Sequence, residues 1–426
     1  MFSVHSDPLA AIGSHDAGGQ NVYTRNLMIH LDKLGWSVDV FNRLDDPQKK
    51  RIAKVGKHSR VIRLAVGKSS YIPKGQLHAY FPEFYEKFLK FNGYQNPYTL
   101  FHGHHYDGGY IGLLAQRQFH QPLVVNFHSL GAVRLKTHQS YDHNGHEHQM
   151  YQERLAMEKE IMQECSIIIS LSKTEKRELE EIYGAPASKV TVIPGGVDIQ
   201  AFSPMAKEKA RSLLGLRPED FIVLFVGRLE WRKGVGTLVG STRLLEAEIP
   251  NLRVLVVGGR IFGSRKNRDD WNEYQRLLAK AQEKHIEDRV HFVGRIDQGR
   301  LPLYYSAADV LVVPSYYESF GLVALEGMAA KIPVVASRVG GLRATIADHA
   351  NGLLFEPHNA SDLQRKIREI YHSKKLAVSL VSRAYQDVVT RYSWSQIAKN
   401  ISDLYDSFIH PDRSLSLFLT LNQKTL

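Results

Sequence analysis

The chain has 426 residues, 43% of them hydrophobic and 23% charged, which suits two globular domains and excludes a largely disordered chain. Its formal net charge is +11, which favours an anionic ligand such as a nucleotide or sugar phosphate about as much as it favours plain solubility. Cys165 is the single cysteine, which argues against disulfides and a cysteine-based zinc site. No apolar run reaches the length of a membrane span, so we expect a cytoplasmic protein.

Short apolar runs rich in β-branched residues recur along the chain and predict parallel strands that are covered on both faces. In chain order they lie at 37–41, 123–127, 166–170, 190–193, 221–226, 253–257, 290–293, 310–313 and 333–336. Stretches with helical spacing of apolar residues lie at 22–34, 155–162, 274–281 and 394–408. Strands that alternate with helices are typical of doubly wound α/β domains.

A connector rich in glycine and proline follows the fourth of these runs, from Gly195 to Pro204. We therefore predict one Rossmann-like domain over 1–198 and a second over 205–380. Helices over 381–410 are expected to pack back across the domains, followed by a tail over 411–426. Two such sheets facing each other would place the carboxyl ends of their strands around a central cleft, where open α/β sheets bind ligands.

The first candidate site is a pair of glycines, Gly18 and Gly19, between the first strand-like run and the first helix. Adjacent glycines let backbone N–H groups approach an anion at the positive end of a helix, although a plain tight turn fits equally well. A phosphate loop and a dinucleotide-binding glycine pattern are both missing, which argues against kinase, P-loop ATPase and dehydrogenase functions.

A second candidate site follows the strand at 310–313, where Glu318 and Glu326 stand eight positions apart. If a helix covers the interval, the two carboxylates lie two turns apart on one face. Carboxylates accept paired hydrogen bonds and so suit the hydroxyls of a sugar or ribose. The alternative is an acidic helix cap at Glu318 and a surface position for Glu326.

A third candidate site follows the strand at 221–226, where Arg228 and Lys233 share one loop. Both cations could reach a diphosphate at the carboxyl end of that strand, although solvated surface charges are the common alternative.

These motifs recur together in one protein family. The matching residues are Gly18-Gly19-Gln20, Arg228 with Lys233, Gly294-Arg295-Ile296, and Glu318 with Glu326. In combination they resemble the retaining glycosyltransferases of the GT-B fold over about 2–408. The stretches 15–23 and 128–131 resemble more specifically the group that contains sucrose-phosphate synthase and sucrose synthase. Relatives that transfer sugars to inositol phosphate share much of the pattern, so the resemblance defines the donor better than the acceptor.

The resemblance implies a UDP-glucose site in the second domain. Arg228 and Lys233 would bind the diphosphate, Glu326 the ribose and Glu318 the glucose. The other donor-site residues that the resemblance implies are Arg295 and Ile296 at the uracil, the backbone of Phe320, Gly321 and Leu322, and, in the first domain, Gly18 and Gly19 at the β-phosphate.

The resemblance also implies an acceptor site in the first domain, with cations and hydroxyls around a phosphate. The matching positions are Gln20, Lys74, Tyr106, Ser129, Arg134 and Arg154, with His128 lining the reaction centre. Arg134 stands where close sucrose-phosphate synthases usually have lysine. Each residue alone would more often be a surface charge, but several converging donors indicate a site.

Clusters of histidine also raise the question of a metal site. They are His102, His104 and His105, and then His138, His143, His146 and His148 in an expected loop. No H-E-x-x-H pattern occurs and the resembling family needs no catalytic metal, so we predict neither a metal nor a cofactor beyond UDP-glucose as co-substrate.

The resulting hypothesis is a metal-independent, retaining glucosyltransferase of sucrose biosynthesis that moves glucose from UDP-glucose to fructose 6-phosphate. The resemblance implies that the leaving UDP oxygen takes the acceptor proton, while Arg228, Lys233 and a helix N-terminus stabilise the developing charge and domain closure excludes water. A separate sucrose-phosphate phosphatase would complete the route to sucrose.

Other functions stay open at this point. The acceptor could be free fructose or inositol phosphate, and the chain could be a nucleotide-sugar binding protein without turnover. A nucleic-acid binder is disfavoured, because the sequence lacks interleaved basic and aromatic residues.

Overall fold

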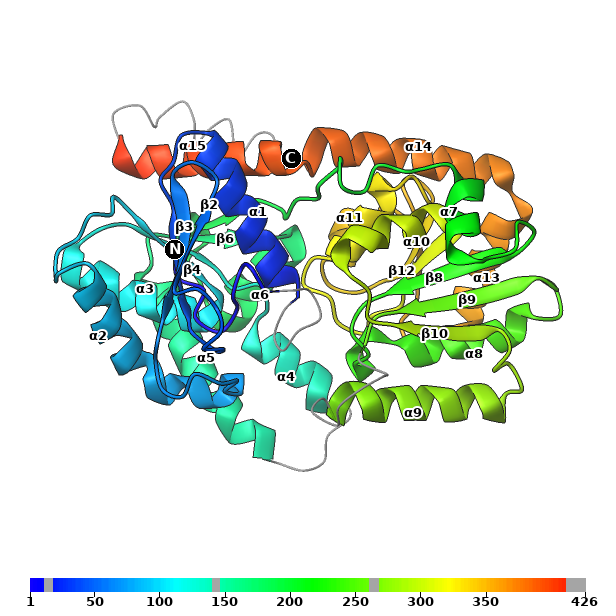
Figure 1. Cartoon of the computed structure of the whole chain (residues 1–426), viewed down its shortest axis with the longest axis horizontal. Coiled ribbons are helices and arrows are strands. Elements are labelled where there is room, and N and C mark those ends of the chain that lie inside the picture. Colours follow the sequence, from blue (N-terminus) through cyan, green and yellow to red (C-terminus); the bar gives the residue numbers. More distant parts are fainter. Residues whose placement is uncertain (11–17, 140–145, 260–267, 411–426) are drawn as a thin grey trace. The chain divides into compact units, whose positions relative to one another are not determined.

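The computed structural model describes residues 1–10, 18–139, 146–259 and 268–410, and these form two units (Figure 1). Unit 1 contains Met1–Gly195 and the helix α15, Trp394–Ile409, and unit 2 contains Gly196–Ser393. The helix α14, Lys374–Arg391, belongs to unit 2, so the domain boundary placed at residue 380 falls inside this helix. The expected tail over 411–426 lies outside the described residues.

Unit 1 is built on two sets of strands that Phe2 joins. One set has the strand order β2-β3-β1 and the other has the order β4-β5-β6-β7. Phe2 forms parallel bridges to Phe41 of β1 and to Gly103 of β4. Strand β2 is antiparallel to β3, and the other pairs are parallel. The strands are β1 Asp39–Arg43, β2 Ile52–Val55, β3 Ser59–Leu64, β4 Phe101–His104, β5 Leu123–Asn126, β6 Ile167–Ser170 and β7 Val190–Val192.

Helix α2 of unit 1 buries an apolar face. In α2, Phe81, Phe84 and Phe88 recur at helical spacing and are all buried, and the ring of Phe88 meets Phe2 edge-on at 5.0 Å. The helices are α1 Gly19–Lys33, α2 Phe81–Phe91, α3 His105–Phe119, α4 Gly131–Gln139, α5 His146–Glu164, α6 Lys173–Tyr183 and α15, with a 3-10 helix at Lys74–Tyr80. Helix α15 packs against α1, where Trp394 meets Tyr23 at 5.2 Å.

Unit 2 has one six-stranded sheet in the order β10-β9-β8-β11-β12-β13, with every pair parallel. Its strands are β8 Phe221–Val226, β9 Leu252–Val257, β10 Val290–Gly294, β11 Val310–Val313, β12 Val334–Ser337 and β13 Leu353–Phe355. Its helices are α7 Lys207–Leu214, α8 Val235–Leu245, α9 Arg268–Glu283, α10 Leu301–Ala307, α11 Leu322–Ala329, α12 Leu342–Thr345, α13 Ala360–His372 and α14. Both units are Rossmann-like, which confirms the predicted doubly wound α/β class.

Two glycines hold the loops of unit 2 close together at the carboxyl edge of the sheet. Gly234 has φ +67°, and a Cβ there would lie 1.8 Å from the carbonyl oxygen of Pro314. Gly258 has φ +123°, and a Cβ there would lie 1.9 Å from the carbonyl oxygen of Gly227. The loops after β8, β9 and β11 therefore interlock by backbone contact, which only glycine permits.

Nine predicted strands correspond to β1 and β5 to β12, with ends displaced by at most two residues, whereas β2, β3, β4 and β13 are not among them. The expected loop at 138–148 is wrong at both of its ends, because α4 continues to Gln139 and α5 begins at His146. Residues 140–145 lie outside the described residues. Within the described part of the chain, no helix is long and apolar enough to cross a membrane.

Candidate active site

The carboxyl edge of the unit 2 sheet brings Lys233 and Glu318 together. Lys233 ends a 3-10 turn after β8, Glu318 lies in the loop after β11, and Lys233 Nζ donates to Glu318 Oε2 at 2.5 Å. Each side chain is 17% exposed. Burial would raise the pKa of Glu318, but Lys233 and Arg232 lower it, so the carboxylate stays ionised. Strands β8 and β11 are neighbours at the point where the chain turns to the other side of the sheet, where such folds bind ligands.

Glu326 lies in a different environment from Glu318. The helix does not cover the whole interval between the two glutamates, because Gly321 has φ +94° and α11 begins only at Leu322. Glu326 therefore projects from the helix, where Tyr305 of α10 donates a hydrogen bond to its Oε2 at 2.6 Å. Burial raises the pKa of Glu326 to about 7, although the bond from Tyr305 opposes this. Glu326 is thus half-buried, and its carboxyl group has a pKa of about 7.

The remaining predicted donor residues lie along the same edge of unit 2. Arg228 follows β8 and forms an ion pair with Glu230 at 2.8 Å, and Arg295 and Ile296 follow β10 and are half-buried. Phe320 is buried, next to Gly321 and Leu322 at the start of α11. The structure therefore gathers this predicted set on loops that follow β8, β10 and β11, while their roles toward a nucleotide stay predictions.

Replacing Glu326 by glutamine is expected to weaken the binding of UDP-glucose by about 1–3 kcal/mol, the size of a charged hydrogen bond. Ionised Glu326 would accept from ribose hydroxyls, so the affinity of the wild type should rise as the pH increases through about 7. Calorimetric titration between pH 5.5 and 8.5 measures both effects. Glutamine still accepts from Tyr305, so the fold is spared. A pH slope that survives in Glu326→Gln would contradict the assignment.

In unit 1, the chain after Phe2 forms a polar network with the start of α1. Asn21 Oδ1 accepts from the backbone N–H of Gly18 and from Ser6 Oγ, both at 2.8 Å. Gln20 Nε2 donates to Ser3 Oγ at 3.3 Å. Gly18 and Gly19 therefore lie at the N-terminus of α1, as the sequence predicts, and Gly19 is exposed there. Residues 11–17, which include part of the stretch 15–23, lie outside the description.

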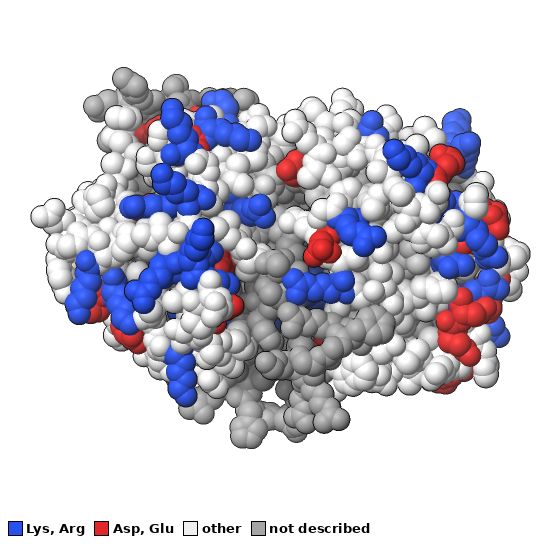
Figure 2. All heavy atoms as spheres, viewed as in Figure 1, with Lys and Arg blue, Asp and Glu red and all other residues white. Residues whose placement is uncertain are grey.

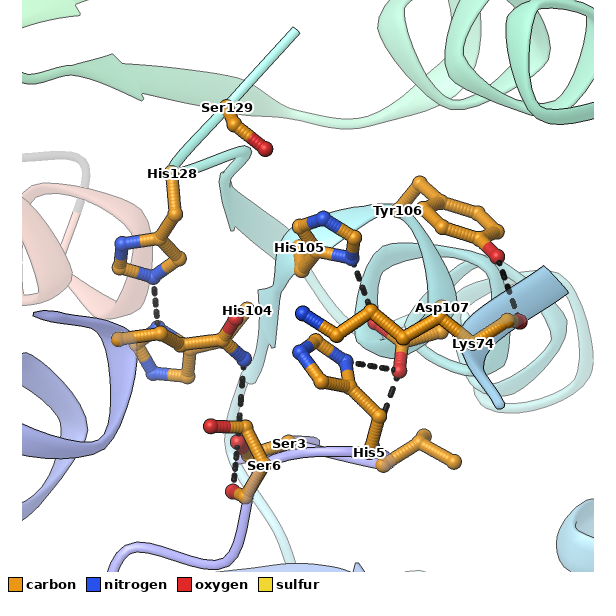
Figure 3. A network of polar contacts seen from close by, with 12 residues as sticks. Ser3, His5, Ser6, Lys74, His104, His105, Tyr106, Asp107, His128 and Ser129 are labelled. Atoms are coloured by element: carbon orange, nitrogen blue, oxygen red, sulfur yellow. Dashed lines mark hydrogen bonds and ion pairs between the residues drawn. The ribbon is translucent and has the colours of Figure 1, made fainter. Parts of the chain in front are cut away.

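Asp107 holds two histidines in the same region (Figure 3). His5 Nδ1 donates to Asp107 Oδ2 at 2.6 Å, and His105 Nδ1 donates to Asp107 Oδ1 at 3.1 Å. All three side chains are almost fully buried. The Lys74 side chain extends toward these imidazoles in Figure 3. Because an ionised carboxylate only accepts, both imidazoles carry a proton on Nδ1.

Arg154 joins three other predicted acceptor residues. It projects from α5, its Nη2 donates to the carbonyl oxygen of Ser129, and its guanidinium lies 5.2 Å from the ring centroid of Tyr106. The hydroxyl of Tyr106 donates to the carbonyl oxygen of Lys74 at 3.3 Å. Residues from four separate segments thus come together at the carboxyl ends of β4 and β5. Arg154 also forms a buried ion pair with Glu158 at 2.7 Å.

His128 follows β5 with a left-handed backbone, φ +58°, and belongs to a row of three histidines. His104 Nδ1 lies 3.0 Å from His128 Nε2, and the rings of His102 and His104 stack at 4.3 Å. Burial lowers the pKa of His102 and of His128 to about 3, so both rings are neutral. A backbone strained in this way, at a non-glycine residue beyond the carboxyl end of a parallel strand, is typical of a functional position.

Arg134, another predicted acceptor residue, is half-buried in α4. Of the histidines outside this site, His138, His143, His146 and His148 have undescribed side chains. The described residues contain one group with metal-ligand spacing, His5, His105 and Asp107, whose ligand atoms lie within 4.8 Å of one another. Their mutual hydrogen bonds account for this spacing.

Comparisons with known proteins identify the family of this chain. Residues 206–387 match the family model of glycosyl transferases group 1, and residues 17–201 match that of glycosyltransferase family 4. A D-inositol 3-phosphate glycosyltransferase from Corynebacterium aurimucosum is 32% identical over 95% of this chain and 94% of its own. The chain belongs to the group 1 glycosyltransferases. A second enzyme of the same name, from Mycobacteroides abscessus, is 34% identical over 95% of this chain and 88% of its own.

Solved structures place this glycosyltransferase in the GT-B fold. A sucrose-phosphate synthase from Thermosynechococcus elongatus superimposes with a TM-score of 0.86 at 37% identity, over 95% of this chain and 97% of that one. HepE from Anabaena, in complex with UDP-glucose, superimposes with a TM-score of 0.71 at 20% identity, over 96% of this chain and all of that one. The second likeness shows the fold alone. The predicted GT-B class is confirmed.

Several residues of the site escaped the sequence analysis, namely His5, Asp107, Glu158, Arg232 and Tyr305. Four of them are partners of predicted residues or lie beside them in the chain, and His5 bonds to one of these four, Asp107. Asp107 adjoins Tyr106, and Glu158 follows Arg154 by one helical turn, so spacing could have indicated both. Tyr305 comes from a helix outside the motif that holds Glu326, and no local signal connects the two.

Proposed function

We propose that this glycosyltransferase transfers glucose from UDP-glucose to fructose 6-phosphate with retention of configuration. The observation that carries the proposal is the 37% identity to a sucrose-phosphate synthase over nearly the whole of both chains, together with the cation and hydroxyl cluster of Lys74, Tyr106 and Arg154. Such a cluster suits a phosphorylated acceptor.

The proposed reaction needs no protein nucleophile. The acceptor hydroxyl oxygen bonds to the anomeric carbon as the bond from that carbon to the UDP oxygen breaks, and the leaving oxygen takes the hydroxyl proton. Lys233 and Arg228 would stabilise the negative charge that develops on UDP, in an edge of the sheet where Glu318 already orients Lys233. Glu318 would bind the glucose hydroxyls.

Inositol 3-phosphate is the second candidate acceptor, since relatives of 32–34% identity bear the name of an inositol phosphate glycosyltransferase. The deciding experiment incubates the protein with UDP-, ADP- and GDP-glucose against fructose 6-phosphate, fructose and inositol 3-phosphate, and identifies the products. Sucrose 6-phosphate from UDP-glucose supports the proposal. Transfer to inositol 3-phosphate alone would replace the acceptor, and donor hydrolysis without any transfer would refute both.

Replacing Lys74 by alanine is expected to reduce kcat/KM for fructose 6-phosphate about tenfold to a hundredfold, the value of one charge-assisted hydrogen bond. Free fructose has no phosphate, so kcat/KM for fructose, which is lower than that for fructose 6-phosphate, should change little in Lys74→Ala. Steady-state rates with both acceptors measure this. Lys68→Ala, an exposed lysine outside the cluster, is the matched control. Equal losses with both acceptors would remove Lys74 from the phosphate site.

Transfer is also expected to persist in excess EDTA, because Arg228 and Lys233 supply the positive charge that a metal would otherwise bring to the diphosphate. Initial rates before and after chelation, and after adding back magnesium or manganese, measure this. Loss on chelation with recovery on metal addition would contradict a metal-independent mechanism.

A further inference from the structure

Unit 1 contains a cavity of about 810 Å³ that is separate from the candidate active site. It is lined by residues that precede β1, β3 and β4, including Trp36, His58 and Tyr98. These strands run parallel, so the cavity lies at their amino ends. His105, Asp107 and His128 follow the carboxyl ends of β4 and β5, at the opposite edge of the sheet. The volume falls within the range of small-molecule sites.

Aromatic side chains contribute to the walls of the cavity. Trp36 and Tyr405 meet edge-on at 5.3 Å, and Tyr98 also lines the cavity. The polar tips of these rings already bond within the protein: Trp36 Nε1 donates to Ser402 Oγ at 2.9 Å, and the hydroxyl of Tyr98 donates to Asp39 Oδ2 at 2.9 Å. What these side chains offer a ligand is therefore apolar ring surface.

The charges of the lining favour an anion. Asp39 is neutralised by a two-fold ion pair with Arg60, at 2.7 and 2.9 Å. The rest of the lining contains two lysines, Lys54 and Lys57, and a single further acid, Asp406. Lys and Arg side chains gather on the face of unit 1 that β2 and β3 cover, as Figure 2 shows. Aromatic walls with an excess of lysines suit a ring compound that carries a phosphate.

The cavity also connects with the candidate active site through packed side chains. His102 lines the cavity and bonds through Nδ1 to the hydroxyl of Tyr405 at 2.5 Å. On its other side, its ring stacks on His104, which bonds to His128. Displacement of Tyr405 by a ligand would act on His102 directly and would reach His128 through two contacts.

We propose that this cavity is an effector site for a small phosphorylated ring compound of the nucleoside monophosphate class, and that its occupancy acts on His128 through His102 and His104. Binding at the cavity does not depend on the proposed acceptor or donor. The effector site and the proposed glucosyl transfer can therefore be refuted independently of each other.

The test uses the full chain in saturating UDP, with AMP as the probe and adenosine and inorganic phosphate as partial probes. Calorimetry should show AMP binding at least tenfold tighter than either partial probe. Lys54→Ala/Lys57→Ala should weaken AMP binding at least tenfold, while Lys33→Ala/Lys50→Ala, exposed lysines outside the lining, should leave it unchanged. Absence of AMP binding, equal binding of phosphate, or equal loss in both double variants would overturn the site.

The connection has its own readout. In protein labelled with ¹⁵N-histidine, AMP should shift the ring signals of His102 and His128. Tyr405→Phe removes the hydroxyl that bonds His102, so it should retain AMP binding but reduce the shift at His128 at least by half. A signal of His128 that does not respond to bound AMP, or responds equally in Tyr405→Phe, would overturn the proposed coupling.

Discussion

Replacing Arg154 by alanine is expected to lower the free energy of unfolding by about 3–5 kcal/mol, the cost of leaving a buried ion without its partner. Glu158 is fully buried and pairs with Arg154 at 2.7 Å, and its remaining hydrogen-bond donors are the backbone N–H of Gly131 and the hydroxyl of Tyr183. Urea denaturation measures the change as a lower midpoint at an unchanged slope.

The control is Arg117→Ala, which removes exposed ion pairs with Glu160 and Glu164 and should cost less than about 1 kcal/mol. This expectation alters the role of Arg154. The family resemblance implies that Arg154 is a cation at the acceptor phosphate, but the structure also gives it a stabilising partner, Glu158. A variant of Arg154 that folds with wild-type stability and loses only acceptor binding would contradict the buried pair.

Replacing Lys233 by alanine is expected to reduce transfer from UDP-glucose about 10²- to 10³-fold, the usual cost of losing one group that stabilises developing charge. Lys233 would contact the diphosphate, and it also neutralises Glu318. Without Lys233, the pKa of Glu318 should rise, because burial then acts with less opposition. Product formation measures the loss of transfer, and UDP affinity measures the loss of the diphosphate contact. Thermal unfolding measures the cost of leaving Glu318 without its partner.

A second substitution separates the chemical effect from the structural one. Lys233→Ala/Glu318→Gln removes the unpaired carboxylate, so it should unfold at a higher temperature than Lys233→Ala while transfer stays impaired. Arg243→Ala, which removes an exposed cation of unit 2 paired with Glu246, is the matched control and should leave both properties unchanged. Recovery of transfer in the double variant would mean that Lys233 serves only to balance Glu318.

The sequence was sufficient where residues carry their structural signal locally. The runs at 221–226 and 310–313 coincide with β8 and β11, because strands buried on both faces must be apolar throughout. It was insufficient for β4, Phe101–His104, which contains two histidines and a glycine yet is completely buried. His102 bonds to Tyr405 of helix α15 and to Asn126 at the end of β5, and His104 Nδ1 bonds to His128 just beyond β5.

The same distinction applies to the site. Motif spacing alone indicated Gly18, Lys233, Glu318 and Glu326, because each stands at a fixed distance from a recognisable strand or helix. Only the tertiary structure decided that Glu318 is held ionised by Lys233 while Glu326 has a pKa near 7, since those environments come from elements far apart in the chain. Likewise, Asp107 meets His5 across 102 positions. Burial and charge partners depend on which segments meet in space, and no local pattern encodes that meeting.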